Sequence, residues 1–233
     1  MTLSKSSPLS LKGVKYSVWA SEETHAFEAT VYLDGEKAMK VTNDGKGGAN
    51  HYYGMKGQSR PSFNSMYQAC RESALEFVTS KSNVFFPHLT DEQFKSVWSN
   101  AEEDDVPVFA ITDDTSVFMW SETELLDFLI VHLLNEHLSI KEMKRQLKAK
   151  VMYFDKSDKS IWEIKLKPTE ENLAYYKRVH EKESEETAAT LLMLSSMKKD
   201  WIWMNDLPED RAFYYWRKAD KANKDKKNGG GER

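Results

Sequence analysis

The chain has a single cysteine, Cys70, among its 233 residues. One thiol excludes an internal disulfide framework and any zinc site built from several cysteines, and it favours a reducing compartment, which makes the cytoplasm the expected location. Long apolar runs are also lacking. The most apolar stretch, residues 125–134, contains Asp127 and His132, and a membrane span requires roughly 20 apolar residues. It predicts a buried helix, so we expect no membrane segment, and the polar start of the chain predicts no secretory signal.

Neither sign of charge dominates, because 33 basic residues stand against 37 acidic ones and the net charge is −4. Residues 217–233 are the exception, since their seven basic and three acidic side chains carry +4 and leave the rest of the chain at −8. Such a lysine-rich, glycine-ended terminus is either a solvated end or a tail that contacts an anionic partner. The content of 40% hydrophobic residues is typical of a folded globular protein.

The first part of the chain predicts an antiparallel β-meander. Residues 11–19 and 27–33 have the period-two pattern of half-buried strands, and the first of them places three side chains on one face, Val14, Tyr16 and Val18. Asp34-Gly35 supplies the positive φ angles of a tight hairpin turn, and residues 36–42 return as a third strand. Apolar residues then recur at helical spacing over residues 62–80, with Ser62 as the expected N-cap.

Later helix starts are indicated by three capping boxes, in which a cap oxygen is paired with a side chain that reaches back: Thr90 with Gln93, Ser121 with Glu124, and Ser139 with Glu142. Two further hairpins are predicted, one from residues 106–111 and 117–120 and one from residues 151–155 and 161–167. Beyond Pro168 the chain is predicted to be helical, with Thr169 as a cap and a last helix that begins near Pro208. The polar middle of this part leaves open one long helix or two.

The expected fold is therefore α+β, with an N-terminal antiparallel β-meander and a packed helix, further β-hairpins and a helical C-terminal part. We expect three parts: residues 1–86 with the meander, a glycine-rich loop and a helix; residues 87–167 with hairpins and helices; and residues 168–233 with helices and the basic tail.

The glycine-rich loop, residues 43–61, holds five of the ten glycines. Loops of this length are functional or disordered more often than not, and glycine lets backbone amides converge on an anion. Three interpretations stay open: consecutive tight turns with the tyrosines packed on the sheet, contact with an anion or nucleotide, and contact with a protein. The candidate ligand-binding residues are Asn43, Asp44, Lys46, Asn50, His51, Tyr52, Tyr53, Lys56 and Arg60.

A strand, the Asp34-Gly35 turn, a second strand and the run Asn43-Asp44-Gly45-x-Gly47-Gly48-x-Asn50 follow one another in residues 22–53. This segment resembles one found in uncharacterised bacterial and bacteriophage proteins. The resemblance implies no substrate and no catalytic residue, and it implies a phage-type accessory protein.

Other residue clusters give little indication of catalysis. His132 and His137 are five positions apart, so a regular helix does not aim them at one metal, and core packing is the expected role. The aspartates at 104, 105, 113 and 114 are expected to be solvated, and Cys70 to be inert on an apolar helix face. We therefore predict no catalytic residue, no metal site and no cofactor.

The aromatic end of the chain, with Trp201, Trp203 and residues 213–216, either docks the last helix or stacks nucleic-acid bases beside the basic tail. The leading hypothesis is a non-enzymatic binding protein with a protein partner or a small anionic ligand. The alternative is an enzyme that processes nucleotides or nucleic acid, in which His51 and nearby carboxylates act on a phosphate held by the loop. Nucleic acid as a partner is less well supported by the acidic body of the chain.

Overall fold

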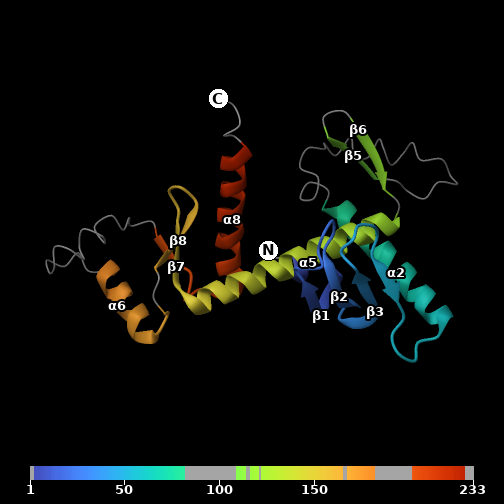
Figure 1. The fold of residues 1–233 in the computed structure, drawn as a ribbon, viewed down its shortest axis with the longest axis horizontal. Coiled ribbons are helices and arrows are strands. Elements are labelled where there is room, and N and C mark those ends of the chain that lie inside the picture. Colours follow the sequence, from blue (N-terminus) through green and yellow to red (C-terminus); the bar gives the residue numbers. More distant parts are fainter. Residues whose placement is uncertain are drawn as a thin grey trace. The chain divides into compact units, whose positions relative to one another are not determined.

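The computed structural model describes residues 3–81, 109–113, 116–120, 122–164, 167–181 and 201–228, and Figure 1 shows their course. The chain divides into two compact units, Thr2–His137 and Leu138–Arg233, the second of which includes Met1. The boundary falls within a helix, where no change in composition marks the sequence. The expected α+β class is confirmed. The three-part division expected from the sequence stays a prediction.

The first unit opens with a short helix, α1 (Leu3–Ser6), and a four-stranded antiparallel sheet in the order β1-β2-β3-β4. Its strands are β1 (Leu9–Ser17), β2 (Ala26–Leu33), β3 (Glu36–Asn43) and β4 (His51–Tyr53). Asp34 and Gly35 have φ values of 49° and 88°, which confirms the tight turn predicted between β2 and β3. The predicted meander is therefore present, with one additional strand.

Strand β1 departs from the predicted alternation at a bulge. Lys12 pairs with Thr30 and Lys15 with Glu28, so Gly13 and Val14 together stand opposite one residue of β2, and Gly13 takes a positive φ of 64°. The extra residue reverses the alternation along β1. The bulge comes before Tyr16, so Val14 and Tyr16 still lie on one side of the strand as predicted. Val18 lies beyond the strand with 75% of its surface exposed, so its predicted place on that face is wrong.

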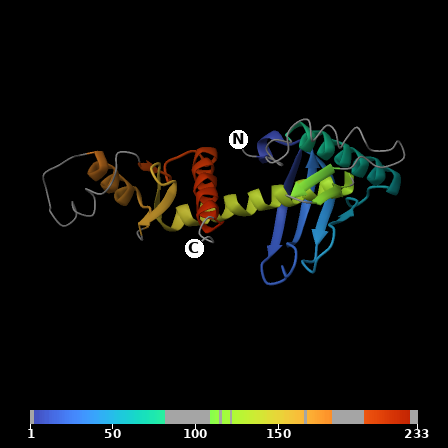
Figure 2. The same cartoon turned by 90° about the horizontal axis from the view of Figure 1, so that it is seen from above.

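One face of this sheet carries the core of the first unit. Buried side chains from β1, β2 and β3 point to this face, and α2 (Arg60–Ser80) contacts β1 and β3 (Figures 1 and 2). Helix α2 is capped by Ser59, whose hydroxyl accepts from Ser62 N, so the predicted cap at Ser62 is wrong by three residues. Arg60 and Pro61, predicted as loop, belong to the first turn, where proline is well tolerated. Buried side chains that share this face include Leu9, Phe27, Ala29, Val31, Met39 and Val41.

The hairpin of β5 (Phe109–Asp113) and β6 (Ser116–Trp120) confirms the predicted pairing of this segment. Helix α5 (Glu122–Ala149) follows, and its first half buries apolar side chains as predicted for residues 125–134. The predicted helix starts at Thr90 and Ser121 lie outside the described residues.

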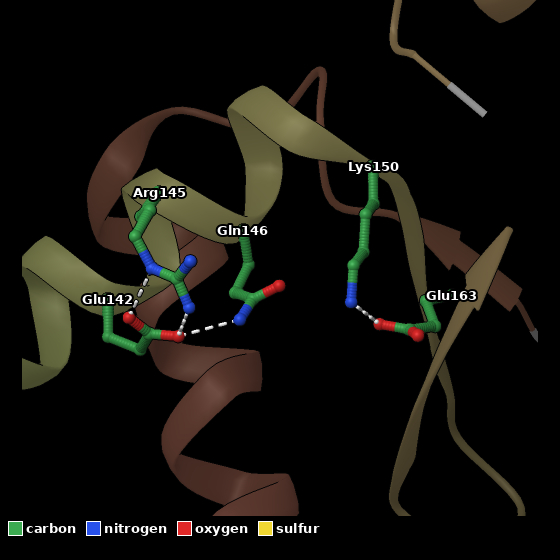
Figure 3. A network of polar contacts seen from close by, with 5 residues as sticks. All are labelled: Glu142, Arg145, Gln146, Lys150 and Glu163. Carbon is green, nitrogen blue, oxygen red and sulfur yellow. Dashed lines mark hydrogen bonds and ion pairs between the residues drawn. The ribbon is translucent and has the colours of Figure 1, made fainter. Parts of the chain in front are cut away.

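No helix begins at Ser139, because α5 continues through it. The expected capping partner, Glu142, instead accepts hydrogen bonds from Arg145 and Gln146 on the next turn, at 2.6 to 2.7 Å (Figure 3). These contacts, Arg145 foremost, hold the pKa of Glu142 at about 2. A capping box read from sequence does not by itself start a helix when the residues before it are helical as well.

In the second unit β7 (Val151–Asp155) pairs with β8 (Ser160–Ile164), which confirms the predicted hairpin. β7 also pairs with β9 (Trp201–Trp203), a strand that was not predicted from the sequence. Thr169 caps α6 (Glu170–Glu181) as predicted, since its hydroxyl accepts from Asn172 N. Residues 182–200, where one helix or two was left open, lie outside the described residues.

Helix α8 (Glu209–Asn228) follows Pro208 as predicted. Phe213 is buried with Met143, Phe154 and Met204, and Tyr215 and Trp216 pack against this cluster. These contacts favour docking of the last helix as the role of the aromatic end. None of the described helices has the length and apolar character required to cross a membrane.

Asn205 joins three parts of the second unit. Its side-chain oxygen accepts from Met152 N at 2.7 Å, and its amide donates to the carbonyls of Leu147 and Lys150 at 2.8 and 2.9 Å. It thus connects the end of α5, the start of β7 and the turn after β9. A partly buried side chain with three partners leaves unpaired backbone groups when it is removed.

We expect Asn205→Ala to lower the free energy of unfolding by about 2 kcal/mol, because three backbone groups lose their partner. Urea unfolding followed by circular dichroism measures the change. Asn223→Ala, at an exposed position of α8, is the matched control and should change it by less than about 0.5 kcal/mol. Equal effects of the two substitutions would contradict the role assigned to Asn205.

Candidate functional site

The predicted glycine-rich loop is not one continuous loop. β4 (His51–Tyr53) pairs with β3 and divides it into residues 44–50 and residues 54–59. Two aromatic β-formers, Tyr52 and Tyr53, were the available signal for this strand. Lys46 therefore precedes β4, whereas Lys56 and Arg60 follow it, and the positive charges predicted for one loop are distributed over two segments and a helix.

The structure divides the nine predicted residues into two groups. One group makes hydrogen bonds within the fold: Asn43, Asp44, Asn50 and Tyr52. The other group is exposed, as Asp44 is too: Lys46, His51, Tyr53, Lys56 and Arg60.

Asn43 is the centre of the turn between β3 and β4 and is 8% exposed. Its side-chain oxygen accepts from Gly45 N at 2.9 Å and from the Thr24 hydroxyl at 2.8 Å. Its amide nitrogen donates to Gly48 O at 3.3 Å and to Asn50 Oδ1 at 3.2 Å. A short amide side chain that bonds the backbone two residues on is the typical support of such a turn.

The backbone amides of the turn, which were candidates for anion binding, have partners inside the protein. Gly45 N donates to Asn43, Lys46 N to the Asp44 carboxylate and Gly47 N to the Thr24 hydroxyl. An anion would have to displace these acceptors, two of which are neutral oxygens and one a carboxylate. The arrangement supports the tight-turn interpretation over a preformed phosphate cradle.

Asp127 of α5 fixes the hairpin from the core side. Its carboxylate accepts from Asn50 N and Asn50 Nδ2, both at 3.1 Å, and from the Tyr52 hydroxyl. Burial, and next the Asp127 charge, raise the pKa of Tyr52 well above its ordinary value. In the sequence, Asp127 is recognisable only as a polar residue in an apolar stretch. A carboxylate on a buried helix face requires donors, and that requirement was the signal for a partner.

The same turn holds the loop between β1 and β2. Gly45 O accepts from the amides of Glu22, Glu23 and Thr24 at 2.9 to 3.2 Å. A Cβ built on Gly45 would lie 2.1 Å from Ala20 O, so the two loops touch through their backbones. Glycine at position 45 is thus required by close approach as well as by its φ of 86°.

The β1–β2 loop displays two apolar side chains to solvent. Trp19 is 89% exposed and Val18 is 75% exposed. Ser21 orders the loop beneath them, because its hydroxyl donates to Ser17 O at 2.7 Å and accepts from Ala26 N at 2.9 Å. We call Val18 and Trp19 the loop tip. The loop tip was not predicted, because a valine and a tryptophan that continue a strand pattern predict a half-buried strand end.

Other candidate residues show packing roles. His132 contacts the Phe128 carbonyl and ring on its own helix, as expected for a packed histidine. Burial raises the pKa of the Cys70 thiol to about 11, which makes it a poor nucleophile. Within the described ranges no group of three or more His, Cys, Asp or Glu side chains is placed to hold a metal ion. The side chains of the aspartates at 104, 105, 113 and 114 lie outside the described part.

Comparison of the chain with protein-family models, with curated proteins and with solved structures gives no match. The resemblance of residues 22–53 to bacterial and bacteriophage proteins therefore stays a prediction.

We expect Gly45→Ala to be much more destabilising than Gly48→Ala. Both positions have a positive φ, but only at Gly45 does a Cβ meet the backbone, whereas at Gly48 it meets open space. The difference should be at least about 2 kcal/mol in the free energy of unfolding, because overpacking against a fixed backbone adds to the common cost of the left-handed conformation. Parallel urea titrations measure it, and equal losses would disprove the contact between the loops.

Tyr52 also predicts a pH dependence of stability. Its ordinary pKa is 10.0, and the folded value is raised. Above pH 10.0 the unfolded chain releases the Tyr52 proton while the folded chain retains it. The free energy of unfolding therefore falls by about 1.4 kcal/mol per pH unit. Tyr52→Phe should remove this loss between about pH 10 and 11, as measured by unfolding at each pH. Tyr53→Phe, exposed on the same strand, is the control and should keep the wild-type slope.

Proposed function

We propose that this chain is a non-enzymatic binding protein that inserts its loop tip, Val18 and Trp19, into an apolar pocket of a partner protein. The observation that supports the proposal is the 89% exposure of Trp19 on a loop fixed by hydrogen bonds. Tryptophan is among the residues most enriched at binding hot spots, because it removes a large apolar surface from water. A loop ordered before binding loses little entropy when it docks.

Charged side chains beside the loop tip indicate which charge the partner's pocket carries at its rim. Glu22, Glu23 and Asp44 are exposed, and Lys46 is the basic residue of the same pair of loops. These two loops, residues 18–25 and 44–50, therefore carry a net charge of −2 when histidine is neutral. A partner pocket with a basic rim is complementary to this negative charge, and the complementarity raises the association rate. A small anion, the other predicted ligand, is disfavoured by this balance.

The resemblance to bacteriophage proteins extends the proposal, since an accessory protein of that kind acts on a macromolecule of its bacterial host. The enzyme alternative needs carboxylates near His51 and a phosphate held by the loop. The carboxylate of Asp44 instead accepts a hydrogen bond from the turn, and that of Asp127 accepts from Asn50 and from Tyr52 of β4. The binding role is therefore the better supported one.

We expect Trp19→Ala to abolish capture of the partner from a nuclease-treated bacterial lysate. With the purified partner, the dissociation constant should rise at least about 30-fold, which corresponds to a hot-spot loss of about 2 kcal/mol. The fold should be unaffected, because an exposed side chain away from the core changes stability by less than about 0.5 kcal/mol.

Trp162→Ala is the matched control, since Trp162 is 51% exposed on β8 in the other unit. It should retain the partner at wild-type affinity. Retention of the same partner by Trp19→Ala at unchanged affinity would disprove the proposal.

A further inference from the structure

The four-stranded sheet has an outward face that the loop tip does not use. Its strands alternate, so side chains that neighbour the buried ones point away from α2. Two rows cross this face through direct strand pairs: Lys12, Thr30, Lys40 and Tyr53 form one row, and Lys15, Glu28, Thr42 and His51 form the next. We call these eight residues the outward face.

The bulge in β1 is what completes the two rows. Lys12 and Lys15 are three positions apart, and in a regular strand they would point to opposite sides. The extra residue at Gly13 and Val14 returns Lys15 to the side of Lys12. Both lysines are exposed, and Lys15 reaches Glu28 across the strands at 3.3 Å.

Aromatic side chains lie among these lysines. Tyr53 is 52% exposed beside Lys40, and His51 is exposed on the same strand. The ring centroid of Tyr32, one row further along β2, lies 4.3 Å from Lys12 Nζ. Exposed rings beside cations are the groups on which unpaired bases stack while the cations contact the phosphates.

The charge of the face is opposite to that of the chain. The outward face carries three lysines and one glutamate, and Lys37, which pairs with Tyr32, adds a further exposed cation. The whole chain has a net charge of −4. Since Glu28 pairs with Lys15, the cations not paired with it are Lys12, Lys37 and Lys40. This local excess is complementary to a phosphate backbone.

We propose that the outward face, together with neighbouring Lys37, binds single-stranded nucleic acid, with Tyr53 as a stacking surface and Lys12, Lys37 and Lys40 as phosphate contacts. Single strands are favoured over duplexes because a duplex hides the base faces that Tyr53 and His51 would contact. Four strands span about 14 Å, so the site holds about two to three nucleotides. This inference goes beyond the protein contact proposed for the loop tip and depends on a separate surface.

Fluorescence anisotropy of the full chain with fluorescein-labelled oligo(dT) and oligo(U) tests the inference, with a duplex of the same length beside them. We expect the single strands to bind more tightly than the duplex. Three phosphate contacts should weaken binding about 20-fold between about 50 and 200 mM salt. Equal or tighter binding of the duplex, or no binding of the single strands at the lower salt, overturns the proposal.

Substitutions locate the site. Tyr53→Ala should weaken binding about 10-fold, while Tyr53→Phe retains it, because stacking needs the ring and not the hydroxyl. Tyr214→Ala is the matched control, since Tyr214 is 53% exposed on α8. The double variant Lys12→Ala/Lys40→Ala should reduce the salt slope by about 1.4. Thermal unfolding checks that each variant folds.

Substitution of Lys46 and Lys56 distinguishes binding at the outward face from binding at the glycine-rich segments. Lys46→Ala/Lys56→Ala should bind oligonucleotides like the wild type, and so should Trp19→Ala. The proposal would be overturned if the Lys46→Ala/Lys56→Ala variant lost oligonucleotide binding while Tyr53→Ala retained it. That result would assign the nucleic acid to the glycine-rich segments, residues 44–50 and 54–59. Loss of a protein partner by Tyr53→Ala, without any oligonucleotide binding by the wild type, would make the face a protein-docking surface and overturn it as well.

Discussion

The carboxylate of Asp127 connects the buried side of the first unit to its exposed loops. It takes three hydrogen bonds from the β3–β4 hairpin, through Asn50 and Tyr52. Asn50 then accepts from Asn43, and Asn43 in turn fixes Gly45 and Thr24. Each of these polar groups is buried or half-buried, so each requires the next as its partner. The position of the β1–β2 loop, and with it the exposure of Trp19, thus depends on a helix residue about a hundred positions away.

Most elements of regular structure could be predicted because their signals are local. The period-two strands, the Asp34-Gly35 turn, the Thr169 cap and the start after Pro208 each depend on a few neighbouring residues, and the structure has them. The wrong or missed elements depend on residues outside the local sequence pattern. Ser139 and Glu142 have the residues of a capping box, but the preceding turns are already helical. β9 is a strand of three residues that pairs with β7, about 50 positions earlier in the sequence.

The candidate site was predictable in its residues and less so in its roles. Asn50 and Tyr52 were named from the sequence as candidate ligand-binding residues, but their partner Asp127 is about 75 positions distant, and no local pattern encodes that contact. The loop tip was missed because β1 ends at Ser17, although Val18 and Trp19 continue its apolar pattern. The bulge at Gly13 is a second feature that sequence periodicity cannot reveal. The same bulge aligns Lys12 and Lys15, so the basic outward face was equally hidden.

The glycines show why composition alone did not decide between a turn and an anion site. Both need positive φ angles and converging amides, and both occur with asparagine and lysine nearby. The difference is which atom accepts the amide hydrogens. Here Asn43, Asp44 and Thr24 accept those of residues 45 to 47, and Gly45 lends its carbonyl to three more amides. The amides of the turn and the Gly45 carbonyl form hydrogen bonds that hold the turn and a second loop in place. A binding role for this region therefore falls to the side chains that the turn positions.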